Sequence, residues 1–179
     1  MEELTGKEHV DFSKYKDAYS DELFKKFVNG EVTDVNDVKK LMFGWTFRPE
    51  YGNGEIPDEF SAEYWERKAD ELYDTDDMSF EKADAYDRNS MLIMHALEST
   101  GDGKTPETAI HVICVPQEYE YMQNVPPYDI LKRRGQSVCD GIDCIYFEKN
   151  TFGIGRLYFN VERVFDGIYA QMFQKQTGQ

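Results

Sequence analysis

The chain has 179 residues with a mean hydropathy of −0.68, and 40% of its residues are hydrophobic. This length is expected to form a single domain over residues 1–179, with a core that hides about two-thirds of the unfolded surface. No stretch approaches the roughly 20 apolar residues of a membrane-spanning helix, and the start MEELTGKEHV lacks the basic and then apolar pattern of a secretion signal. We therefore expect a cytoplasmic protein, unless a signal peptide has been removed.

The net charge of −15 is unevenly distributed along the chain. Residues 1–100 carry 25 acidic and 12 basic side chains, whereas residues 101–179 carry 10 and 8. A surface of this kind repels nucleic acid and anionic membranes and attracts a basic protein. The charge also has a simpler interpretation, as a feature that keeps the protein soluble.

Residues 1–100 show apolar residues at helical spacing, which predicts about four helices. The first includes residues 23–28 and stops at Asn29-Gly30, where glycine ends helices readily. The second follows a cap at Thr33 or Asp34 and ends at Arg48-Pro49, because the residue before proline disfavours helical backbone.

The other two predicted helices should form an antiparallel pair. One runs from about Asp58 to Tyr73 and the other from a cap at Ser79 to Gly101, with few polar residues between them. Turn-forming residues predict a loop from Tyr51 to Pro57.

From residue 109 the pattern becomes that of strands. Ala109–Val115 is apolar on both faces, which predicts a central strand. Asp140-Gly141 is a strong signal for a two-residue hairpin turn within 136–148, because both positions tolerate positive φ. This turn places Cys139 opposite Ile142 and Cys144 opposite Ser137, so the two cysteines are too far apart for a disulfide.

A further strand is predicted over 154–161, and a short last helix carries apolar residues from Val164 to Phe173. The fold class is therefore α+β, with about four N-terminal helices over 1–100 packed on one face of an antiparallel C-terminal sheet over 101–179.

Several short motifs resemble a family of bacterial proteins, domain-of-unknown-function family 4919 (DUF4919). They are Gly101-Asp102-Gly103, Glu107-Thr108-Ala109, Val112-Ile113, Glu118-Tyr119, Gln136-Ser137, Leu157-Tyr158-Phe159 and the stretch from Leu41 to Gly52. Members often begin with a secretion signal, which this chain does not show. The family has no assigned activity, so the resemblance implies a fold and no catalytic residue.

Two motifs could suggest a bound ligand. Gly101 to Thr105 ends like a phosphate-binding loop, but Glu98 stands where the full motif needs glycine. A helix stop tied into the sheet by Asp102 and Thr105 fits better. His111, Cys114, Cys139 and Cys144 could bind zinc, but His111 and Cys114 would point to opposite faces of a strand. All three cysteines are expected to be small buried apolar residues.

Two further motifs could suggest catalysis or calcium binding. Cys114 with His95 or His111 could form a nucleophilic pair, but no helix start is predicted beside the thiol to activate it. His95 is expected to be a structural histidine. The acidic run Asp74–Asp77 lacks the remaining features of a calcium loop and is expected to cap and charge the next helix. No catalytic residue, metal or cofactor is predicted.

The sequence therefore favours a non-enzymatic interaction protein, possibly of the immunity type, that neutralises a basic partner. The predicted partner-binding residues are Glu63, Glu66, Asp70, Glu71, Asp74, Asp76 and Asp77, with tyrosines in loops (Tyr51, Tyr119, Tyr121 and Tyr128) supplying contact area. The first alternative is a hydrolase or small-ligand-binding domain with a pocket between helices and sheet. The second is a structural module of a surface or secretion system.

Overall fold

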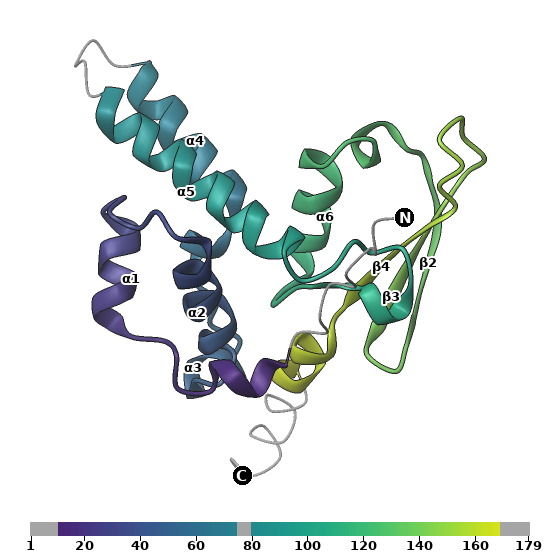
Figure 1. The fold of residues 1–179 in the computed structure, drawn as a ribbon, viewed down its shortest axis with the longest axis horizontal. Coiled ribbons are helices and arrows are strands. Elements are labelled where there is room, and N and C mark those ends of the chain that lie inside the picture. The colour runs from purple at the N-terminus through teal and green to yellow at the C-terminus, as the bar shows by residue number, and fades with distance from the viewer. Residues whose placement is uncertain (1–10, 75–79, 169–179) are drawn as a thin grey trace, which may run out of the picture.

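The computed structural model describes residues 11–74 and 80–168. Figure 1 shows helices on one side and a twisted sheet on the other, with α6 between them. The α-helices are α1 (Asp21–Val28), α2 (Val35–Trp45), α3 (Pro49–Gly52), α4 (Ala62–Tyr73), α5 (Phe80–Glu98) and α6 (Val115–Asn124). The strands are β1 (Ile110–His111), β2 (Arg133–Cys139), β3 (Ile142–Phe147) and β4 (Arg156–Asn160). Short 3-10 helices are η1 (Phe12–Tyr15), η2 (Asp58–Phe60), η3 (Pro106–Thr108) and η4 (Tyr128–Ile130).

Side-chain caps fix where the N-terminal helices begin. Ser20, Asp34 and Ser61 accept hydrogen bonds from backbone N–H groups in the first turns of α1, α2 and α4. Each such cap stabilises a helix by about 1 kcal/mol. Asp34, and not Thr33, is therefore the cap of the second helix. The predicted cap Ser79 lies outside the described residues.

The predicted antiparallel pair is the α4/α5 hairpin, defined here as α4 and α5. Its inner half packs on the other helices: Trp65 of α4 makes an edge-on contact with Phe27 of α1, with ring centroids 5.5 Å apart. The amide of Asn89 on α5 donates a 2.8 Å hydrogen bond to the carbonyl of Phe27. The outer ends of α4 and α5 extend beyond the rest of the described chain (Figure 1).

The sheet has the strand order β1-β4-β3-β2. The predicted hairpin is confirmed, with φ of 50° at Asp140 and 74° at Gly141. Cys139 pairs with Ile142 and Ser137 with Cys144, as predicted, and the cysteines are free thiols. Cys139 is nevertheless exposed and Cys114 only partly buried, so the expectation of three buried cysteines is wrong.

The prediction of a central strand over Ala109–Val115 is also wrong. The strand in this region, β1, has two residues at the edge of the sheet and runs parallel to β4, so the sheet is mixed and not wholly antiparallel. The chain then leaves the sheet, because Cys114 is the N-cap of α6 and Pro116 lies in its first turn. Proline suits that place, since its missing N–H would have had no helical partner.

The helical half also departs from prediction in detail. Pro49–Gly52 forms the single turn α3 where a loop was expected, and the third predicted helix is split into η2 and α4. The tyrosines expected in loops lie in helical turns: Tyr51 in α3, Tyr119 and Tyr121 in α6, and Tyr128 in η4. The α+β class itself is confirmed.

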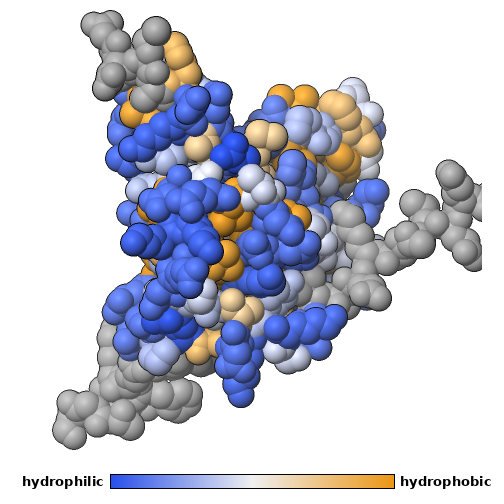
Figure 2. Space-filling model, turned by 60° about the vertical axis from the view of Figure 1, so that its left-hand side comes forward, coloured by the Kyte–Doolittle hydropathy of each residue, from blue (hydrophilic) through white to orange (hydrophobic). Residues whose placement is uncertain are grey.

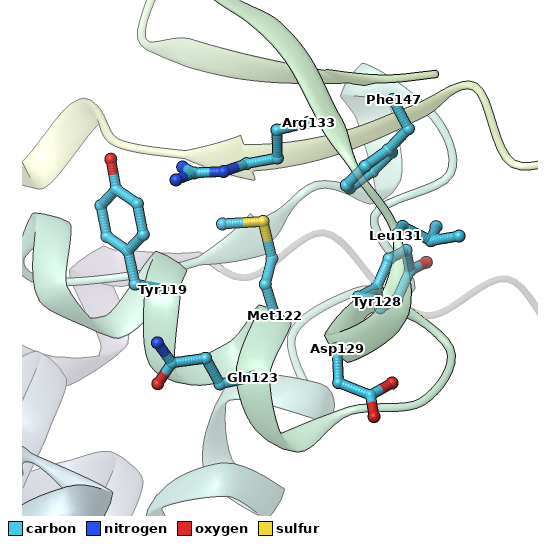
Figure 3. A pocket seen from close by; sticks show the side chains of 8 residues that line it. All are labelled: Tyr119, Met122, Gln123, Tyr128, Asp129, Leu131, Arg133 and Phe147. Carbon is cyan, nitrogen blue, oxygen red and sulfur yellow. The ribbon is translucent and has the colours of Figure 1, made fainter. Parts of the chain in front are cut away.

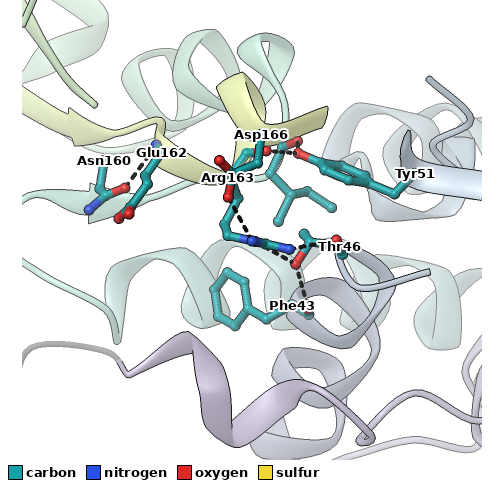
Figure 4. Close-up of polar contacts among 8 residues, drawn as sticks. Phe43, Thr46, Tyr51, Asn160, Glu162, Arg163 and Asp166 are labelled. Carbon is teal, nitrogen blue, oxygen red and sulfur yellow. Dashed lines mark hydrogen bonds and ion pairs between the residues drawn. The ribbon is translucent and has the colours of Figure 1, made fainter. Parts of the chain in front are cut away.

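A set of polar contacts ties the two halves together (Figure 4). The Tyr51 hydroxyl lies 2.7 Å from the carbonyl oxygen of Ile113 and 3.0 Å from that of Arg163. The Arg163 guanidinium donates to the hydroxyl and the carbonyl of Thr46, at 3.0 and 2.6 Å. These contacts dock the helix at 162–168 on α2 and α3, and the remainder of the predicted last helix lies outside the described residues.

Gly167 belongs to this docking. A Cβ atom at Gly167 would lie 2.9 Å from Cε1 of Tyr51, so glycine is required for the close approach. A single cluster of buried apolar side chains runs from α1 and α2 through α5 to the sheet, and it includes Phe27, Phe43, Ile93 and Phe159.

Candidate functional site

The predicted partner-binding residues lie along α4. Glu63, Glu66, Asp70, Glu71 and Asp74 are all exposed. Glu63, Glu66, Asp70 and Asp74 are spaced so that they share one side of the helix. We call these five residues the acidic stripe. Asp76 and Asp77 lie outside the described residues.

Within the part of the chain that the structure describes, few cations neutralise the acidic stripe. Lys68 lies 3.1 Å from Glu71, and Glu66 accepts a 3.1 Å hydrogen bond from the Ser90 hydroxyl. Asp74 is the C-cap of α4, and the rest of the acidic run that was expected to cap and charge the next helix lies outside the described residues. A carboxylate near a helix C-terminus is unfavourable electrostatically, which fits a role outside stability.

Aromatic side chains stand at the outer end of the hairpin. The rings of Tyr73 and Phe80 lie 6.4 Å apart and are 43% and 56% exposed. The Tyr73 hydroxyl lies 2.9 Å from Asp87 and 3.1 Å from Asp84, and these hydrogen bonds raise the Tyr73 pKa to about 12. The hairpin therefore combines apolar contact area with surrounding carboxylates. Figure 2 shows that hydrophilic residues cover most of the side bearing α1, α4 and α5, with smaller apolar patches among them.

A separate pocket of about 150 Å³ lies between α6, η4 and the strands β2 and β3 (Figure 3). Met122, Tyr128, Leu131 and Phe147 supply its apolar surface, and Tyr119, Gln123, Asp129 and Arg133 supply its polar groups. The Arg133 guanidinium lies over the Tyr119 ring, 4.8 Å from its centroid. In Figure 3 the Asp129 carboxylate points away from the Arg133 guanidinium.

Two carboxyl groups are buried where α6 packs on the sheet. Glu118 of α6 is 1% exposed and Asp143 of β3 is 2% exposed. Asp143 accepts a hydrogen bond from the Gln136 amide on β2. Burial, followed by the proximity of Asp143, raises the Glu118 pKa to about 8, and burial also raises the pKa of Asp143. This pair was not predicted from the sequence.

A cavity of about 360 Å³ separates the start of α4 from the start of α6, and Cys114 lines it. No helix start was predicted beside a cysteine, and this prediction is wrong, since α6 begins directly after Cys114. A helix N-terminus favours a thiolate, but burial outweighs that effect and raises the Cys114 pKa to about 12. The thiol is therefore not an activated nucleophile.

The two candidate histidine partners are placed differently from each other. His95 is exposed on α5, so it is not the structural histidine that was expected. His111 is buried, and its ring lies 4.9 Å from that of Phe12.

The loop that resembled a phosphate-binding motif is tied into the sheet. Asp102 accepts hydrogen bonds from the Lys104 backbone at 3.1 Å and the Thr108 hydroxyl at 2.6 Å. A Cβ atom at Gly103 would lie 2.5 Å from Leu157, so glycine allows close packing on β4. Thr105 caps η3. Within the described ranges, no three His, Cys, Asp or Glu side chains gather as metal ligands would, and no helix there is long and apolar enough to cross a membrane.

Comparison with known proteins identifies the family. The domain of unknown function DUF4919 matches residues 72–169. The matched range contains α5, α6, the whole sheet, the pocket and the carboxyl pair, whereas most of α4 and the stretch from Leu41 to Gly52 precede it. Neither a curated protein nor a solved structure was found to match. The match spans more than half of the chain, so this protein belongs to the DUF4919 family.

Proposed function

We propose that the protein is a non-enzymatic interaction domain of the immunity type, which binds a basic protein through the α4/α5 hairpin. The observation that supports this most is the acidic stripe beside the exposed rings of Tyr73 and Phe80, on a hairpin that projects from the rest of the fold. Interfaces commonly have aromatic residues at the centre and charged residues at the rim.

The charge acts mainly on the rate of encounter. Carboxylates on a projecting helix attract a basic surface over about 10 Å at 0.1 M salt, and added salt screens this attraction. Contacts by the aromatic rings are short-ranged and determine how long the complex lasts. Association should therefore slow steeply with salt, while dissociation changes little.

This proposal is tested by capturing the partner from the native cell and measuring binding kinetics over a range of ionic strength. Asp74→Asn should slow association without lowering the unfolding temperature, because Asp74 is exposed and its charge lies at the unfavourable end of α4. Recovery of acidic partners only, or an association rate that does not depend on salt, would contradict the proposal. The negative charge would then serve only to keep the protein soluble.

The pocket in Figure 3 supports a second candidate, a small-ligand-binding domain. Its volume of about 150 Å³ is similar to that of a cavity that holds benzene. Within the described chain, Arg133 has no carboxylate partner at ion-pair distance and stands beside the apolar walls. A benzene-sized group bearing a carboxylate fits this combination.

Benzoate and the neutral benzyl alcohol are matched probes for this second candidate. Ligand-detected NMR should show benzoate binding that is lost in Arg133→Gln and kept in Arg134→Gln. Equal binding of both probes, or binding unaffected by Arg133→Gln, would contradict the candidate.

A further inference from the structure

The Glu118 and Asp143 carboxyl groups face each other across the junction of α6 and the sheet. Gln136, Asp143 and Ile145 share one face of the sheet, because Gln136 pairs with Ile145 and side chains alternate along a strand. The two carboxyls are within hydrogen-bonding reach of each other. A site this well buried strongly disfavours two negative charges in contact.

The hydrogen bonds around the pair are incomplete. Among the described residues, none donates a hydrogen bond to either carboxyl oxygen of Glu118 or to Oδ1 of Asp143. Buried carboxylate oxygens without a donor are costly. Two ionised carboxylates cannot supply the missing donor, since each only accepts, but one proton on either group makes an O–H···O bond between them.

The surrounding groups do not supply a compensating positive charge. Within residues 11–74 and 80–168, neither carboxyl forms an ion pair. On α6, Glu120 accepts a hydrogen bond from the Ser61 hydroxyl. The charge of Glu118 also raises the pKa of the Cys114 thiol, which lies directly before the helix. On β2, Arg133 lies over Tyr119.

The remaining charged groups of the sheet lie elsewhere. Arg156 of β4 lies over the Tyr146 ring, and Tyr158 accepts from Arg156. Tyr146, Arg156 and Tyr158 are on the opposite face from Asp143, by the same alternation. Glu162, beyond β4, is exposed and adds only negative charge.

We propose that Glu118 and Asp143 form a one-proton site, in which a shared proton holds α6 against β3 at neutral pH and its loss weakens that junction. The site is local to α6, β2 and β3, so it is independent of partner binding by α4. Its removal would alter the pH dependence of stability even if the proposed function were wrong.

The sign of the effect follows from the raised pKa of Glu118, about 8 in the folded protein against an ordinary value of 4.5. Between these two pH values the folded chain retains a proton that the unfolded chain has lost. Stability therefore falls as pH rises through this window, by about tenfold in the folding equilibrium constant per pH unit for one proton. The fall levels off once the folded pair also ionises.

Denaturant unfolding from pH 5 to pH 9 tests the site in the full chain. Glu118→Gln keeps the shape of the side chain and donates a hydrogen bond to Asp143 at every pH. Between pH 5 and pH 8 the variant should therefore lose less stability than the wild type, by about a factor of ten in the folding equilibrium constant per pH unit. Asp70→Asn, an exposed control on α4, should retain the wild-type slope. An unchanged slope in Glu118→Gln would overturn the proposal.

Infrared spectroscopy provides a second readout that does not depend on a variant folding. The wild-type protein at pH 6.5 should show a C=O band from a protonated carboxylic acid that disappears by pH 9.5, and Asp143→Asn should change it. Absence of that band would overturn the proposal. The proposal would also be overturned if magnesium, calcium, manganese or zinc chloride raised the unfolding temperature of the wild type but not that of Glu118→Gln. A cation would then take the place of the proton between the two carboxyls.

Discussion

At the residue scale, Tyr51 connects parts of the chain that are far apart in sequence. Its hydroxyl reaches the carbonyls of Ile113 and Arg163, and burial raises its pKa. Its ring also lies so close to residue 167 that a side chain larger than that of glycine would collide with it. The sequence predicted Tyr51 to be an interface tyrosine in a loop. Its burial could not be predicted, because the contacts that bury it come from residues more than 60 positions away.

Tyr51→Phe should lower the free energy of unfolding by about 1–3 kcal/mol, because it leaves buried carbonyls without their donor while keeping the ring. Denaturant melts at neutral pH measure this. Tyr73→Phe is the matched control, since Tyr73 is exposed, and it should change stability by less than about 0.5 kcal/mol. Equal effects of the two substitutions would contradict the role given to Tyr51.

The buried carboxyls show another limit of prediction at this scale. Asp143 stands in the strand-like run Ile142 to Phe147, and Glu118 stands in a polar stretch. A signal was present, since a charged residue in an apolar strand needs a partner when it is buried. With 35 acidic residues in the chain, however, the partner could not be selected from the sequence.

At the element scale, prediction succeeded where the signal is local. The cap at Asp34, one of the two residues predicted for that place, and the turn Asp140-Gly141 each depend on a few adjacent residues. The α6 helix was missed because several of its buried residues are polar, including Gln117, Glu118 and Glu120, which hides the apolar period. The parallel pairing of β1 with β4 depends on long-range packing that spacing does not encode.

The β2–β3 hairpin gives a prediction of its own. Gly141→Val should destabilise the protein by about 1 kcal/mol or more, because φ is 74° there and β-branched residues avoid that region. A Cβ atom would also lie 3.3 Å from the Cβ of Glu162. Thermal unfolding measures the loss.

Gly155→Ala provides the control for the hairpin. The φ angle of Gly155 lies outside the left-handed region, and no atom of the described residues lies within 4 Å of the place that an alanine Cβ would take, so this change should have little effect. If the Gly141→Val protein were as stable as Gly155→Ala, the turn would not need the positive φ angle at residue 141.

At the scale of the whole molecule, the acidic stripe and the pocket lie on different parts of the fold. The stripe belongs to the projecting α4/α5 hairpin, and the pocket lies where α6 meets the sheet (Figures 1 and 3). Most of α4 precedes the range that matches DUF4919, whereas the pocket lies inside it. A partner bound by the stripe would therefore contact a part of the chain outside that range.

In the proposed function, the position of the negative charge, and not its total, determines binding. Two variants separate these effects by removing the same number of charges, four from the total of −15. The hairpin variant carries Glu63→Gln, Glu66→Gln, Asp70→Asn and Asp74→Asn. The control variant carries Asp17→Asn, Glu55→Gln, Asp129→Asn and Glu162→Gln, all at exposed positions outside the α4/α5 hairpin.

The decisive measurement is the association rate of these two variants with the captured partner at low salt. We expect association to be at least about tenfold slower for the hairpin variant than for the control variant, with neither variant unfolding at a lower temperature than the wild type. Equal slowing of both variants would contradict the account, because the partner would then respond to net charge alone.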